Sequence, residues 1–179
     1  MSTAARETST DAGAVNDAWR EALNRHDPDA VAACFTEDGV MVENGTGQRC
    51  EGRSAIRETA VGFFNAFSEL NIEQTSHLIS GSMFNAEWTM SGVHTGDLPG
   101  LPATGRSFSV VGAKFTEVRD GEILSATLYW NMADLLAQVG VLLAPAQKGP
   151  PPAPLPRPGH DGQTEQTEQM PPGADPTYP

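Results

Sequence analysis

Apolar and polar residues alternate along residues 84–95, which is the clearest strand pattern in the chain. Every second side chain from Phe84 to Met90 is apolar, and a period of two places such side chains on one face of a β-strand. His94 falls on that same face. The pattern predicts a strand that buries one face and ends near Thr95. The apolar set consists of Phe84, Ala86, Trp88 and Met90.

A second strand is predicted from Arg106 to Val118. The Asp120-Gly121 pair after it is a strong hairpin signal, because a two-residue turn needs positive φ angles that Asp-Gly tolerates. A third strand over residues 121–131 should therefore run back antiparallel, with a helix beginning at Met132. One face of the second strand carries Phe108, Val110, Gly112, Lys114 and Val118.

The third strand has two faces of opposite character, and the pattern leaves open which face lies inside. If the polar row lines a wet cavity, the apolar row becomes an exposed patch, which predicts a homodimer. If the polar row faces solvent, the apolar row faces the interior. The polar row is Ser125, Thr127, Tyr129 and Asn131, and the apolar row is Leu124, Ala126, Leu128 and Trp130.

Three helices are predicted in the first part of the chain. Apolar residues recur at spacings of three and four over residues 15–23, which is typical of an amphipathic helix. Asp27 is a good N-cap and Pro28 suits the first helical position, so a short second helix should follow over residues 29–35. A third helix over residues 54–67 contributes three phenylalanines to the interior. Segments 39–45 and 70–80 are predicted strands.

Composition divides the chain into three parts. Residues 1–12 are small and polar and are expected to fray. Residues 13–143 have the apolar content of one domain. Eleven of the 14 prolines lie from Pro145 onward, so residues 144–179 are expected to form a disordered, proline-rich tail.

The charge and the cysteine content exclude several classes of function. The 179-residue chain has a net charge of -12, which disfavours nucleic acid and anionic membrane surfaces as partners. No secretory signal or membrane-spanning apolar run is visible, so a soluble, cytoplasmic protein is expected. Cys34 and Cys50 are then expected to be free thiols.

Two runs of residues carry a resemblance to a known family. GVHTGDLPGLPATGR at 92–106 and YWNMADLLAQVGVL at 129–142, with the Asp-Gly turn between them, resemble the SnoaL-like polyketide cyclases, or ester cyclases, of the nuclear transport factor 2-like superfamily. The resemblance covers roughly residues 14–143. It implies an α+β fold in which a cone-shaped, curved mixed β-sheet wraps around N-terminal helices, a cystatin-like α+β barrel.

The same resemblance implies a function. It implies an enzyme of secondary metabolism, including antibiotic biosynthesis, that closes a ring in a hydrophobic polyketide-like substrate by cofactor-independent aldol chemistry. Members usually carry an acidic residue where this chain has Asn131, and often also where it has Lys114. An amide cannot accept the proton, although it can donate a hydrogen bond to an oxyanion, so the usual mechanism does not transfer intact.

His94 is the leading candidate for the catalytic base, because histidine titrates near neutral pH and this one shares a face with Trp88. A lone histidine on an apolar strand is, alternatively, a buried structural residue. Asn131 is the candidate oxyanion donor. Asp97 is a second candidate base at the cavity mouth, although an aspartate after glycine is also a common turn former.

Lys114 could stabilise an enolate or hold a carboxylate if it points inward, whereas a bulge at Gly112 would turn it to solvent. No metal site is expected, because the four histidines are scattered. No cofactor is expected either, since phosphate-loop and nucleophile-elbow motifs are missing from the sequence. The candidate substrate-binding residues are Trp88, Met90, Phe108, Lys114, Tyr129 and Phe64.

Two alternatives to ring closure follow from the amide at position 131. The cavity could catalyse a changed reaction, such as hydroxylation or formation of an epoxide or a spiro ring. It could also belong to a non-catalytic small-molecule-binding or assembly protein.

Overall fold

The computed structural model describes residues 4–142, with side chains from residue 12 onward. Four helices and six strands follow one another along this part of the chain. In order they are α1 (Ala4–Asn24), α2 (Pro28–Ala33), β1 (Phe35–Glu43), β2 (Gln48–Glu51), α3 (Gly52–Ala66), β3 (Phe67–Ser80), β4 (Met83–His94), β5 (Ser107–Arg119), β6 (Glu122–Trp130) and α4 (Met132–Gln138).

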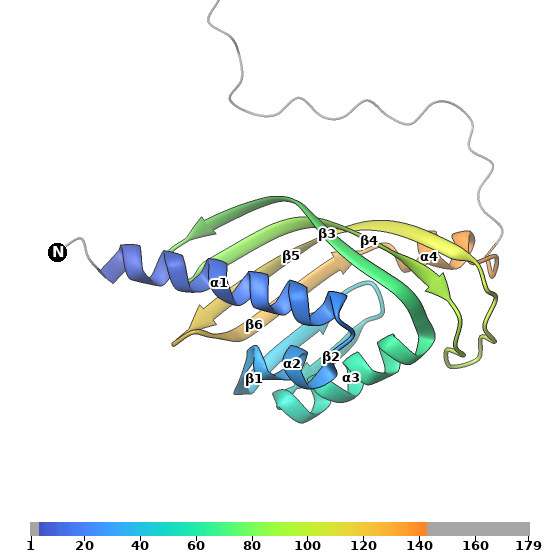
Figure 1. The fold of residues 1–179 in the computed structure, drawn as a ribbon, viewed down its shortest axis with the longest axis horizontal. Helices are drawn as coiled ribbons and strands as arrows, with labels where there is room; N and C mark the ends of the chain where they lie inside the picture. The colour runs from blue at the N-terminus through green and yellow to red at the C-terminus, as the bar shows by residue number, and fades with distance from the viewer. Residues whose placement is uncertain (1–3, 143–179) are drawn as a thin grey trace, which may run out of the picture. The chain divides into compact units, whose positions relative to one another are not determined.

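The six strands form one mixed sheet in the order β2-β1-β6-β5-β4-β3. Only the β1–β6 pair is parallel, and every other neighbouring pair is antiparallel. Figure 1 shows the sheet strongly curved, with α1 running along its inner face and α2 and α3 lying beside β1 and β2. The predicted α+β class and the curved mixed sheet wrapped around N-terminal helices are confirmed.

Local sequence signals account for the main turns. Asp120 and Gly121 have φ angles of 53° and 80°, which is the two-residue hairpin turn expected of Asp-Gly. At the start of α2, the Asp27 carboxylate accepts a hydrogen bond of 2.9 Å from the Ala30 amide, so the predicted N-cap is confirmed. These turns fix the β5–β6 pairing and the angle at which α2 leaves α1.

The core has two parts, one toward each end of strands β4 and β5. The first packs α1, α2 and α3 against β1 and β6, with Trp19 and Phe35 in edge-to-face contact at 5.3 Å between ring centroids. The second packs α4 and the end of α3 against β4 and β5, with Phe67 and Phe108 at 5.0 Å. The cavity described below lies where these two clusters meet.

Two sequence predictions, on the first helix and on the cysteines, have a definite outcome in this fold. Helix α1 begins at Ala4 rather than after the first dozen residues, because Ala, Arg and Glu in that segment are good helix formers. Cys34 and Cys50 are free thiols, as expected. The predicted disordered tail, residues 144–179, lies outside the described residues. Between residues 4 and 142, no helix is long and apolar enough to cross a membrane.

Candidate functional site

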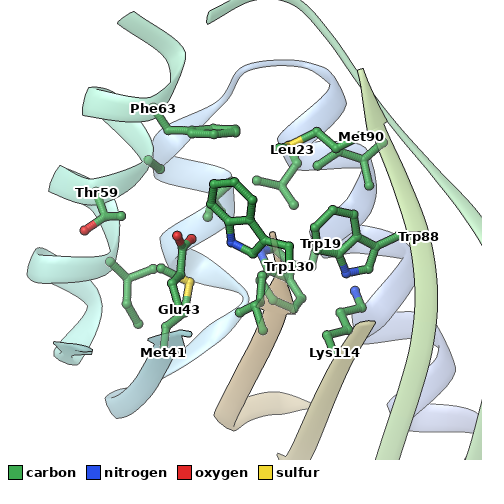
Figure 2. Close-up of a pocket in the computed structure, with 15 residues that line it drawn as sticks. Trp19, Leu23, Met41, Glu43, Thr59, Phe63, Trp88, Met90, Lys114 and Trp130 are labelled. Atoms are coloured by element: carbon green, nitrogen blue, oxygen red, sulfur yellow. The ribbon is translucent and has the colours of Figure 1, made fainter. Parts of the chain in front are cut away.

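A cavity opens between the helices and the inner face of the sheet (Figure 2). The cavity and its mouth together enclose about 710 Å³ of empty space, part of which is open to solvent. Most of its walls are apolar. The lining residues are Trp19, Leu23, Val31, Met41, Glu43, Ile56, Thr59, Ala60, Phe63, Ile72, Trp88, Met90, Lys114, Leu128 and Trp130.

The two charged side chains among these lining residues, Glu43 and Lys114, lie in one row across the sheet. Glu43 on β1 pairs with Leu128 on β6, Leu128 pairs with Lys114 on β5, and Lys114 pairs with Ala86 on β4. Neighbouring strands are about 4.8 Å apart, so the Cα atoms of Glu43 and Lys114 are separated by roughly 10 Å. Figure 2 shows the two side chains entering the cavity from these different strands. A flat substrate lying over Leu128 would therefore have the carboxyl group of Glu43 near one end and the amine of Lys114 near the other.

The next row across the sheet provides aromatic walls. Trp130 on β6 pairs with Gly112 on β5, and Gly112 pairs with Trp88 on β4. A Cβ atom at Gly112 would overlap the Trp88 indole. The absence of a side chain at Gly112 therefore leaves the space that this ring occupies against β5. Gly45 has the same relation to the Trp130 indole. The sequence thus places a glycine beneath or beside each of the two tryptophans.

Helix α3 closes the cavity with a single face. Ile56, Thr59, Ala60 and Phe63 line it, and their spacing of three and four residues is that of one helical stripe. Thr59 supplies a hydroxyl that receives a 3.0 Å hydrogen bond from the Gln48 amide and lies 3.1 Å from the Cys50 sulfur. This side of the cavity is therefore apolar except for one hydroxyl that is already engaged.

Lys114 is the most unusual residue of the cavity. Its side chain is only 7% exposed, and its Nζ lies 4.3 Å from the ring centroid of Trp19 and 5.5 Å from that of Phe84. Among the described residues it makes no ion pair closer than 4 Å. Burial, followed by the positive charge of Arg20, lowers the pKa of Lys114 from 10.5 to about 7. A substantial fraction of Lys114 is then an uncharged amine at neutral pH.

Glu43 has the opposite shift. Its carboxylate points into the cavity between Met41 and Trp130 (Figure 2), and burial raises the pKa of this carboxyl above its usual range. Two titratable groups with pKa values displaced toward each other in one apolar cavity are typical of acid/base sites. Burial thus shifts the pKa values of Glu43 and Lys114 in opposite directions within one cavity.

The three predicted catalytic residues do not line this cavity. His94 is fully buried at the end of β4, where its Nδ1 lies 3.1 Å from the Thr104 hydroxyl and its ring lies against Phe67. Asp97 is exposed, and its carboxylate accepts a 2.8 Å hydrogen bond from the Ala103 amide. Asn131 is an exposed N-cap whose Oδ1 accepts from the Asp134 amide at 3.2 Å. The structure does not bring these three residues together.

The predicted substrate-binding residues divide into two groups. Trp88, Met90 and Lys114 line the cavity, and the bulge that would have turned Lys114 outward is absent at Gly112, since the β4–β5 register is unbroken. The other three residues lie outside the cavity lining, and a role for them in substrate binding stays a prediction. Phe108 is buried beside Phe67, Phe64 stacks on His26 so that its neighbour Phe63 reaches the cavity, and Tyr129 is 51% exposed on the outer face.

The inner face of β6 is thus the apolar row. Leu128 and Trp130 line the cavity, and Ala126 is buried. The alternative in which Ser125, Thr127 and Tyr129 formed the cavity wall is wrong, because the register that pairs Trp130 with Gly112 turns Tyr129 away. The reason first given for a homodimer, an exposed row containing Leu128 and Trp130, fails with it.

Glu43 is the functional candidate that the sequence interpretation missed. Its segment was predicted as a short strand, and a period of two from Gly39 through Met41 to Glu43 places the carboxylate on the same face as buried Met41. That alternation was available in the sequence. The segment is short and flanked by glycines, so the pattern carried little weight by itself.

The comparisons with known proteins agree with this architecture. Residues 13–139 match the family described as SnoaL-like polyketide cyclase. Aklanonic acid methyl ester cyclase DauD of Streptomyces sp. (strain C5) is 31% identical over 150 residues, which are 81% of this chain and 91% of DauD.

Solved structures show the same fold. A candidate polyketide cyclase from Xanthomonas campestris pv. campestris is similar with a TM-score of 0.64 and 28% identity, over 74% of this chain and 98% of that one. A hypothetical protein with a ketosteroid isomerase-like fold, from Catenulispora acidiphila, is similar with a TM-score of 0.64 and 23% identity, over 72% and 93% of the two chains. The expected fold family is therefore confirmed.

Proposed function

Because the chain belongs to the SnoaL-like polyketide cyclase family, we propose that it closes a ring in a polyketide-like small molecule by acid/base chemistry of its own side chains. One observation carries the proposal: Glu43 and Lys114 occupy one cross-strand row in an otherwise apolar cavity. The residues of the reaction are thus assigned from the geometry of this chain.

The chemistry needs little help from the protein when the substrate activates itself. A methylene between two carbonyls is already acidic, so ring closure needs a base near that carbon, a group that activates the carbonyl, and walls that fold the chain. Glu43 is the proton carrier in this proposal, since a carboxyl with a raised pKa is a stronger base when ionised. Lys114 activates the carbonyl at the other end of the row, and the Trp88 and Trp130 rings hold the substrate flat.

We propose structural roles for the earlier catalytic candidates. His94 connects the end of β4 to the 95–106 loop through Thr104, Asp97 shapes that loop, and Asn131 caps α4. Each of these contacts engages the side chain with the protein's own backbone or hydroxyl groups. None requires a substrate.

A homodimer is part of the proposal, on a different surface from the one first expected. Val111 is 71% exposed, Phe115 49% and Tyr129 51%, and all three lie on the outer face of β5 and β6. Phe115 and Tyr129 contact each other edge to face, with ring centroids 5.9 Å apart. Exposed aromatic and aliphatic side chains of this size on one sheet face favour association.

The test is turnover of aklanonic acid methyl ester, chosen because DauD is named for it. An intramolecular aldol closure conserves mass, so the product is sought by chromatography as an isomer of the substrate. Glu43→Gln and Lys114→Met should each lower the rate by about 10²-fold or more, as expected for loss of an acid/base group. Glu73→Gln, an exposed position on β3, is the matched control and should leave the rate unchanged, as should His94→Gln if the protein folds.

Other outcomes point to the alternatives. A product that has gained oxygen would indicate hydroxylation or epoxide formation instead of ring closure. Saturable binding of several aromatic polyketides without any product would favour a binding protein. Full activity of both the Glu43 and the Lys114 variants would show that neither residue takes part in catalysis.

A further inference from the structure

We propose that the Nζ amine of Lys114 is a nucleophile that forms an imine with a ketone carbonyl of the substrate in this cavity. The inference rests on the proposed function, because it places a carbonyl compound between Glu43 and Lys114. It goes further in two ways. Lys114 activates that carbonyl through a covalent C–N bond, and the substrate class is limited to ketones.

The position of Lys114 within the sheet favours access to its amine. Its strand neighbours in the row are Ala86 and Leu128, and the next inward position on its own strand is Gly112. Ala86 is a small neighbour, and the space over Gly112 is occupied by the Trp88 indole, which forms an aromatic wall on that side. Lys114, Trp88 and Trp130 line the same cavity, so a ketone held between the two rings would share that cavity with Nζ.

The surroundings of Lys114 are those of a reactive amine rather than of a structural cation. A lysine that stabilises a fold is usually solvated or paired with a carboxylate, because burying an unpaired ammonium is costly. Here the ring of Trp19 lies over Nζ, and the charge with the larger effect on it, Arg20, has the same sign. Asp17 and Cys34 act in the opposite direction but with a smaller effect. Desolvation together with a cationic neighbour is a known way to activate a lysine nucleophile.

Glu43 has the complementary property that imine chemistry requires. Forming an imine consumes a proton when the hydroxyl of the tetrahedral adduct leaves as water. Burial raises the pKa of the Glu43 carboxyl, so this group holds its proton to higher pH than an exposed carboxyl and can supply it to the leaving hydroxyl, and its carboxylate can then remove the proton from the α-carbon. The separation of roughly 10 Å between the two Cα atoms leaves room for the substrate between the groups.

The steps balance without any further reactant. The neutral amine attacks the ketone carbon and gives a carbinolamine, which loses water with a proton from the Glu43 carboxyl and becomes a protonated imine. The Glu43 carboxylate removes the α-proton, and the resulting enamine carbon bonds to the second carbonyl carbon, whose oxygen takes the proton back. Water then hydrolyses the restored imine, which returns the ketone, the free amine and the protonated carboxyl.

The experiment traps the imine with a small probe and does not depend on turnover. The full-length protein is incubated at about pH 7 with ethyl acetoacetate and sodium cyanoborohydride, and the adducts are located by peptide mass mapping. Lys114 lies in the segment SFSVVGAKFTEVR, residues 107–119, which trypsin cannot cut at an alkylated lysine. The chain has one other lysine, Lys148, which serves as the internal comparison, and the α-amino group of Met1 is scored separately.

We expect at least about tenfold more adduct on Lys114 than on Lys148, because a lysine of ordinary pKa is almost fully protonated at pH 7. Lys114→Met should lose this adduct while Lys148→Arg keeps it. Labelling of Lys114 should also reach half of its maximum near pH 7, and Glu43→Gln should slow it. Equal labelling of the two lysines, or no label on Lys114 in the folded wild-type protein, would overturn the inference.

The trapping result separates this inference from the proposed function. If Lys114 is trapped but no tested substrate is cyclised, the result supports the imine proposal and refutes the proposed cyclase function. The Lys114→Arg variant keeps a cation but cannot form an imine. If the wild-type protein cyclises a substrate and this variant does so at the same rate, the result refutes the imine proposal and supports the proposed cyclase function.

Discussion

Replacing Lys114 with methionine should change how the stability of the protein depends on pH. Methionine has a similar length and no charge, so it can fill the space of the lysine stem among Trp19, Ala86 and Leu128. The wild-type protein carries a group whose pKa falls on folding from 10.5 to about 7. The variant lacks that group, and most other titrations cancel in the comparison.

The sign follows from proton counts. Between pH 7 and 10.5 the unfolded wild-type chain holds a proton on Lys114 that the folded protein has lost, so wild-type stability rises with pH across this window. Below pH 7 both states hold the proton, and the folded state carries the full cost of the buried charge. A difference of one bound proton corresponds to about 1.4 kcal/mol for each pH unit. From about pH 8 to about pH 9.5, wild type should therefore gain about 2 kcal/mol relative to the variant.

Urea denaturation at a series of pH values, followed by tryptophan fluorescence, measures this difference directly. The two proteins are compared at each pH, and the difference in the free energy of unfolding is plotted against pH. A slope near zero throughout pH 8–9.5 would show that Lys114 keeps its ordinary pKa in the folded protein, through solvation or an ion pair. Both the acid/base role and the imine would then lose their physical basis.

Three further predictions concern packing, capping and association. Gly112→Ala should cost about 1–3 kcal/mol in urea denaturation, because its Cβ would overlap the Trp88 ring; Gly62→Ala, with open space around its Cβ on α3, is the control and should be neutral or stabilising. Asn131→Asp should keep the thermal midpoint within a few degrees and should not raise activity, since either side chain caps α4; a gain in turnover would show that this position reaches the substrate. Tyr129→Glu should convert the proposed dimer to a monomer in light scattering, and a monomeric wild type would refute the dimer.

The strands were the most predictable part of the molecule. The alternation from Phe84 to Met90 and the Asp120-Gly121 turn are both local signals, and the structure has the strands and the hairpin where these signals place them. The start of α1 was not predicted, because the residues before Asp11 have helix propensity but no apolar stripe. A pattern based on apolar spacing detects only the part of a helix that is buried.

The alternation along the strands predicted which side chains are buried, but not which of them line the cavity. His94 shares the inner face with Trp88 and Met90, yet it lies at the end of β4, where Phe67 and the 95–106 loop cover it. Whether an inward side chain reaches empty space depends on which helix lies over it. That depends on long-range packing, and a period of two carries no information about it.

The choice between the faces of β6 was likewise set by its neighbours. From composition alone, either row of side chains on β6 could face the interior. Trp130 faces inward in register with Gly112, which makes room for the Trp88 indole, and the Trp130 indole itself lies against Gly45. The meaning of Gly112 could only be read once its partners on β4 and β6 were known.

The environment of position 114 sets the pKa of any titratable residue placed there. This chain has a lysine at that position, next to Ala86 and Leu128 in its row and against the Trp19 ring. Desolvation raises the pKa of a buried carboxyl and lowers that of a buried amine, so the same surroundings would shift either kind of residue toward neutral. A position of this kind can therefore hold a proton-exchanging group of either charge type. A carboxylate there exchanges protons or stabilises charge, whereas a neutral amine can also bond to a carbonyl carbon, and Glu43 two strands away remains free to carry the protons which that bond requires.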